Sequence, residues 1–136
     1  MTLNEYQKQA MTTCMPSSEN FSYMFLNLVG EVGEFASKVA KAIRKGQCSI
    51  GLDSHIAEQY ECGDSTSNDL WLFGGEQERL EELKKEAGDV LWQLSGLCTV
   101  MGWSLEDIAQ MNLDKLAARK EAGTIDGNGD GIIRGK

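Results

Sequence analysis

The stretches "NLVGEVGEFASKVAKAIRKG" (residues 27–46) and "LKKEAGDVLWQL" (residues 83–94) decide the fold of this chain. Each one places two acids three residues apart within a run of apolar residues. Glu31 and Glu34 form the first pair, and Glu86 and Asp89 form the second. Residues three apart project from the same side of an α-helix. Both stretches therefore predict helices that carry two carboxylates on one face.

Beyond these stretches, the spacing of apolar residues predicts four helices and no strand. The predicted helices cover approximately residues 3–14, 19–45, 76–101 and 104–121. Gly46 suits the C-cap of the second helix, and Ser104 followed by Asp107 resembles a capping box at the start of the fourth. Residues 47–75 are predicted to form a long irregular insertion or loop, because they are rich in Gly, Ser, Asp and Asn. The predicted fold class is all-α, a bundle of about four helices.

The composition of the 136-residue chain predicts one acidic domain that spans residues 1–136. The net charge of −8 disfavours DNA or RNA as a partner, because both carry negative phosphates. No apolar run is long enough to cross a bilayer, and the N-terminal residues lack the basic and apolar regions of a signal peptide. The cysteines show no CxxC spacing. These features together predict a cytoplasmic protein with free thiols and no membrane partner.

The two acidic pairs predict a metal site. Four carboxylates on two facing helices repel one another unless a cation compensates their charge. Magnesium, manganese and calcium all prefer oxygen ligands, so we expect one of these divalent cations at the site. Gly33 and Gly88 lie inside the two pairs, and we expect them to allow close helix approach around the ion. The predicted metal ligands are Glu31, Glu34, Glu86 and Asp89.

Basic side chains continue the same periodicity. Lys38 and Lys41 extend the carboxylate face of the second helix. Asn112, Lys115 and Arg119 form one stripe on the fourth. Next to metal-bound carboxylates, such cations suit the phosphate oxygens of a nucleoside triphosphate. For each cation taken alone, an ordinary solvated helix face is an equally good interpretation.

In their order and spacing, these motifs resemble the MazG family of all-α nucleoside triphosphate pyrophosphohydrolases. The resemblance rests on Glu31-Val-Gly-Glu34 and Glu86-Ala-Gly-Asp89, on "LNEYQ" at residues 3–7 and on "GWSLEDIAQMNLDKLAARK" at residues 102–120. It implies magnesium-dependent cleavage between the α- and β-phosphates of ribo- or deoxynucleoside triphosphates, which would clean the nucleotide pool. It also implies a homodimer or tetramer.

The resemblance further implies roles for individual residues. Glu31 or Glu34 would orient or deprotonate the attacking water. Asn112 would contact the nucleotide. The cations Lys38, Lys115 and Arg119 would neutralise charge on the phosphates.

The C-terminal residues 124–136 allow three interpretations, the simplest of which is an ordinary tail rich in Gly, Asn and Asp turns. "TIDGNGDGII" at residues 124–133 has the alternating Asp and Asn of a calcium-binding EF-hand loop. It lacks the Glu at the twelfth position and the helix that would follow, which argues against calcium. The family resemblance implies instead a flexible flap over the nucleotide, with Arg134 as a substrate-binding residue.

Two other functions remain open from the sequence. A di-iron or di-manganese bundle needs ExxH motifs on its core helices. The only histidine, His55, lies in the 47–75 insertion, which makes that alternative weak. A non-catalytic module that binds a nucleotide or a protein partner is the second alternative. The presence of all four acids argues against it without excluding it.

Overall fold

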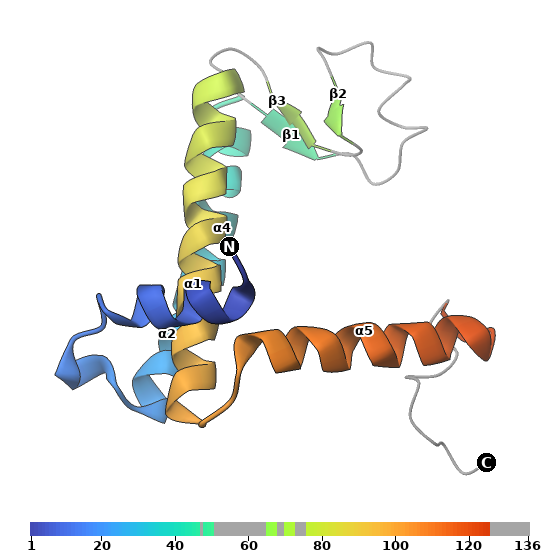
Figure 1. Ribbon diagram of the computed structural model, residues 1–136. Coiled ribbons are helices and arrows are strands. Elements are labelled where there is room, and N and C mark those ends of the chain that lie inside the picture. Colours follow the sequence, from blue (N-terminus) through green and yellow to red (C-terminus); the bar gives the residue numbers. More distant parts are fainter. Residues whose placement is uncertain (47, 51–64, 68–69, 73–75, 126–136) are drawn as a thin grey trace. The chain divides into compact units, whose positions relative to one another are not determined.

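The computed structural model describes residues 1–46, 48–50, 65–67, 70–72 and 76–125 (Figure 1). In this part of the chain the α-helices are α1 (Leu3–Met11), α2 (Phe21–Arg44), α4 (Glu76–Val100) and α5 (Leu105–Glu121), with a short 3-10 helix η1 (Pro16–Ser18). The predicted all-α fold is confirmed, and every predicted helix is present with ends within three residues of the prediction.

The region predicted to be irregular contains three short strands. They are β1 (Cys48–Ile50), β2 (Ser65–Ser67) and β3 (Leu70–Leu72). They pair antiparallel in the order β1-β3-β2, with Cys48 opposite Leu72. The sequence pattern missed these strands because three residues are too few to show an alternation of apolar and polar side chains.

Helix ends follow the predicted capping chemistry. The Ser104 hydroxyl accepts a hydrogen bond from the Asp107 amide at 3.2 Å, so Ser104 is the N-cap of α5. Gly46 ends α2 with a φ of +68°, a left-handed conformation that favours glycine. At α1, Thr2 and Glu5 form a full capping box that was not predicted from the sequence.

The chain divides into two compact units, residues 1–24 with 95–136 and residues 25–94. In the first unit, α1 is held to the start of α5 by polar contacts. The Gln7 side chain accepts from the Leu105 amide at 2.7 Å and donates to the Trp103 carbonyl at 2.9 Å. Met24, Cys98 and Leu105 are the buried apolar side chains in the described part of this unit.

Gly96 leaves room for a buried side chain inside the first unit. It is buried on α4, and a Cβ atom there would overlap the end of the fully buried Met24 side chain. The expectation that Gly33 and Gly88 permit close helix approach is wrong. Within the described residues, a Cβ at either position would meet no atom within 4 Å.

Gly96→Ala is expected to lower the free energy of unfolding by about 1–3 kcal/mol, because the added methyl group displaces Met24 from a packed position. Gly88→Ala is the matched control, since it makes the same change at an exposed site of the same helix. It should raise stability by roughly 0.5–1 kcal/mol, because alanine favours a helix. Urea denaturation of both variants in a chelator measures the difference. Equal effects would contradict the packing role of Gly96.

In the second unit, α2 and α4 lie side by side (Figure 1). Asn27 of α2 is hydrogen bonded to Gln93 of α4, and Lys38 of α2 forms an ion pair with Glu86. The earlier residue of α2 thus contacts the later residue of α4, and the later residue of α2 contacts the earlier one of α4. The two helices therefore run antiparallel. No described helix is both long enough and apolar enough to cross a membrane.

Candidate metal centre

The predicted acids meet between α2 and α4, inside the second unit. Glu31, Glu86 and Asp89 each offer one carboxylate oxygen, and these oxygens lie within 4.8 Å of one another. Opposite oxygens around an octahedral magnesium ion lie about 4.2 Å apart, because each bond is about 2.1 Å long. The three carboxylates therefore fit a divalent cation after small side-chain movements. The structure brings together three of the four predicted ligands.

The three carboxylates differ in their exposure. Glu86 is buried, Glu31 is half-buried and Asp89 is exposed. Burial raises the pKa of Glu31 most, and the negative charge of Asp89 raises it further. A hydrogen bond from Asn27 opposes this shift, while the charges of Glu86 and Glu34 add to it. The site is thus costly to ionise fully, which a bound cation would relieve.

Lys38 brings one positive charge to the edge of the cluster. Its Nζ lies 2.8 Å from Oε1 of Glu86. This hydrogen bond is the main cause that raises the pKa of Lys38, and the charges of Glu82 and Glu34 contribute to the same effect. Glu34 is exposed on α2, one turn after Glu31, and lies outside the cluster of three.

Two amides complete the site, and neither was predicted from the sequence. Asn27 donates from Nδ2 to Glu31 Oε1 at 3.3 Å and to Gln93 Oε1 at 2.9 Å. Gln93 is only 1% exposed, and a buried amide needs hydrogen-bond partners. The spacing of these two amides from the acids could have predicted their place in the site. Asn27 precedes Glu31 by four residues, and Gln93 follows Asp89 by four, so each extends a carboxylate stripe by one helical turn.

Asn27→Ala is expected to lower the free energy of unfolding by about 1–3 kcal/mol, because the buried Gln93 carbonyl loses this donor. It should also weaken Mn²⁺ binding about tenfold, since Glu31 loses the amide that orients it. Gln110→Ala is the control, because Gln110 donates to Asp114 at 2.9 Å in an exposed pair with the same spacing on α5. That variant should change stability by less than about 0.5 kcal/mol. Urea denaturation and Mn²⁺ titration measure both effects, and equal losses in the two variants would contradict the role of Asn27.

The other predicted binding residues lie on α2 and α5. Lys41 is exposed on α2. Asn112 and Lys115 are exposed on α5, which belongs to the first unit. Arg119 is half-buried near the end of α5, where its Nη2 atom donates to the Thr124 carbonyl at 3.5 Å. The Thr124 amide donates in turn to the Arg119 carbonyl at 2.8 Å, so this turn closes the helix.

The predicted tail and most of the predicted insertion lie outside the described residues. Arg134 falls in residues 126–136, to which the flap and calcium interpretations mainly apply. His55 falls in residues 51–64. These interpretations stay predictions.

Comparison with known protein families places most of the described helices in one domain. The sequence profile described as the MazG nucleotide pyrophosphohydrolase domain matches residues 19–124, which include α2, α4 and α5. The chain belongs to the MazG family. This confirms the predicted resemblance, and MazG membership indicates a hydrolase that acts on nucleotides.

A phage protein supports the same relationship. The chain is 34% identical over 114 residues to the Gene 37 protein of Mycobacterium phage L5. The alignment covers 84% of this chain and 78% of that protein. Comparison with solved structures finds no significant match.

Proposed function

We propose that this MazG protein is a magnesium-dependent pyrophosphohydrolase of ribo- or deoxynucleoside triphosphates. The cluster of Glu31, Glu86 and Asp89 on the helices of a MazG domain is the observation that carries the proposal. Its ligands are all oxygen atoms, which suit magnesium and also manganese. Glu34 completes the proposed ligand set from the exposed face of α2.

The proposed reaction is attack of a water molecule on the α-phosphorus. A new phosphorus–oxygen bond forms while the bond to the oxygen that bridges to the β-phosphate breaks. The products are the nucleoside monophosphate and pyrophosphate. Glu31 or Glu34 accepts the proton of the water.

Magnesium, when bound, supplies positive charge that polarises the phosphate and orients the triphosphate. The proposed cations of the chain would each neutralise charge on phosphate oxygens and so stabilise the charge that develops in the transition state. The proposed substrate-binding residues are Lys38, Lys41, Asn112, Lys115, Arg119 and Arg134. Cleaning of the nucleotide pool in the cytoplasm is the biological role that we propose for this reaction.

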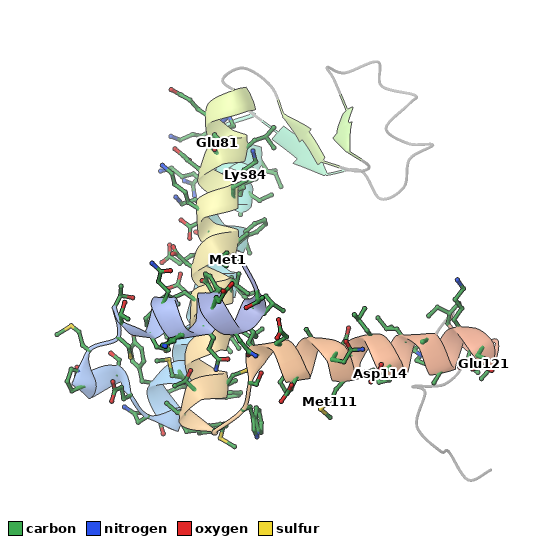
Figure 2. The ribbon with its side chains drawn as sticks, in the orientation of Figure 1. Met1, Glu81, Lys84, Met111, Asp114 and Glu121 are labelled. Atoms are coloured by element: carbon green, nitrogen blue, oxygen red, sulfur yellow. The ribbon has the colours of Figure 1, made fainter. Side chains whose placement is uncertain are left out.

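Pyrophosphate release from a panel of ribo- and deoxynucleoside triphosphates, with magnesium or with a chelator, tests the function. We expect release that requires magnesium and that falls by a factor of about 100 or more in Glu34→Gln. Glu81→Gln is the matched control, because Glu81 pairs with Lys84 at 2.8 Å on an exposed face of α4 (Figure 2). Such exposed pairs contribute little, so this variant should keep its activity. No release from folded protein with any nucleotide would reject the enzyme and favour a non-catalytic binding module.

An exposed apolar stripe on α2 supports the proposed homodimer or tetramer. Phe25, Val29 and Val32 are spaced at four and three residues, and their exposed fractions are 47%, 61% and 52%. Asn27, Glu31 and Lys38 of α2 face α4 or the metal cluster, whereas the apolar stripe is largely exposed among the residues that the structure describes. Large exposed apolar patches mark interaction sites. A second copy carries the same stripe, so we propose that it is the partner.

Val29→Lys is expected to weaken self-association by a factor of about 30 or more, because an unpaired charge buried in an interface costs about 2 kcal/mol or more. Met15→Lys is the control, since Met15 is 67% exposed and lies outside α2. Sedimentation velocity over a range of concentrations measures the effect. A wild-type protein that sediments as a monomer would refute the proposed self-association.

A further inference from the structure

The ion pair between Lys38 and Glu86 involves a carboxylate of the metal cluster itself. Lys38 Nζ lies 2.8 Å from Glu86 Oε1, and Glu86 also lies within the cluster of Glu31 and Asp89. The Glu86 side chain is only 12% exposed, so few solvent molecules can screen its charge. The ammonium group is therefore a main source of positive charge for the most buried of the three acids.

A divalent cation bound by the cluster would come close to this ammonium group. Two cations that share one carboxylate repel each other, most strongly where solvent screening is weak. The Lys38 side chain is 40% exposed, and its flexible stem allows the ammonium to leave Glu86 for solvent. The charges of Glu34 on α2 and Glu82 on α4 also act on Lys38, so these acids attract the ammonium after it leaves Glu86.

We propose that Lys38 competes with the divalent cation for Glu86, and that metal binding releases the Lys38 ammonium for the phosphates of the nucleotide. This inference rests on the proposed function, because it requires the metal site. Lys38 is thereby the counter-ion of Glu86 in the metal-free protein and a phosphate ligand once the metal is bound. By thermodynamic linkage, a phosphate group that takes up the released ammonium strengthens metal binding.

Mn²⁺ binding without nucleotide, followed by electron paramagnetic resonance, tests the competition. Lys38→Gln should bind Mn²⁺ about three to five times more tightly than the wild type, which is the upper part of the range expected for removal of a partly exposed ion pair. Lys41→Gln is the matched control, because it removes the same charge one turn further along α2. Its affinity should change less than twofold. Circular dichroism verifies that each variant is folded.

The outcomes separate the inference from the function on which it rests. Wild-type protein that binds no Mn²⁺, or binding that Asp89→Asn leaves intact, would reject the metal site and the inference with it. Binding that is lost in Asp89→Asn but is no tighter in Lys38→Gln than in Lys41→Gln would reject the inference alone.

Chemical labelling of the lysine amines gives a second readout that does not depend on activity. Acetylation followed by mass spectrometry should modify Lys38 several times faster when magnesium saturates the site, because the amine no longer pairs with Glu86. Lys41 serves as the internal control in the same sample. An unchanged rate at Lys38, in protein shown to bind the ion, would overturn the proposed exchange.

Discussion

Asp89→Asn is expected to reduce pyrophosphate release about 1,000-fold, which corresponds to roughly 4 kcal/mol of transition-state stabilisation. The substitution keeps the size of the side chain and removes one of the three charges that would hold the cation. Asp89 is exposed, so the helix should fold as before. The loss should therefore come from weaker metal binding and weaker charge stabilisation, and not from unfolding.

Steady-state release of pyrophosphate, measured over a range of magnesium concentrations, checks this prediction. Asp114→Asn is the control, because it makes the same chemical change at an exposed site on α5 (Figure 2). It should keep wild-type activity. If Asp89→Asn retained more than about a tenth of the activity at every magnesium concentration, Asp89 would not be a ligand of the catalytic ion.

Glu31→Gln is expected to have opposite effects on stability and on activity. In a chelator it should raise the free energy of unfolding by about 0.5–2 kcal/mol, the range of single stabilising substitutions. The reason is that the Glu31 carboxylate is desolvated and lies beside Asp89 and Glu86, which raise its pKa. The amide keeps the shape and can still accept from Asn27. The same change should reduce catalysis about 100-fold or more, because it removes a ligand and a candidate base.

The pH dependence of stability gives a sharper test of the same residue. Since the folded pKa of Glu31 is raised, the folded state binds this proton more tightly than the unfolded state does. In a chelator, protonation of Glu31 should therefore raise the free energy of unfolding as pH falls. The rise begins at neutral pH, passes through the raised pKa of the folded state and ends near the ordinary value of 4.5. The difference in melting temperature between wild type and Glu31→Gln should shrink over this range. A constant difference in melting temperature would show that burial and the neighbouring acids do not raise the pKa of Glu31.

Local spacing was sufficient to predict the helices and the acidic pairs. Helix periodicity depends on residues three and four apart, so spacing alone places Glu31 with Glu34, and Glu86 with Asp89, on shared faces. The caps at Gly46 and Ser104 depend on equally local chemistry. The three-residue strands were missed because their pairing joins segments that are distant in the sequence.

The sequence by itself determined the all-α fold class, the helix positions and the set of candidate metal ligands, because each depends on short-range spacing. Only the tertiary structure decided which side chains meet. It joined Glu31 to Glu86 and Asp89 and left Glu34 on an exposed face. It revealed the hydrogen bond between Asn27 and Gln93. It also showed that Gly96 is the glycine packed against a side chain, that of Met24, while Gly33 and Gly88 are not packed against any residue that the structure describes. These contacts depend on the rotation and the translation of one helix relative to the other. Packing over the whole helix interface determines both, and no local sequence pattern encodes them.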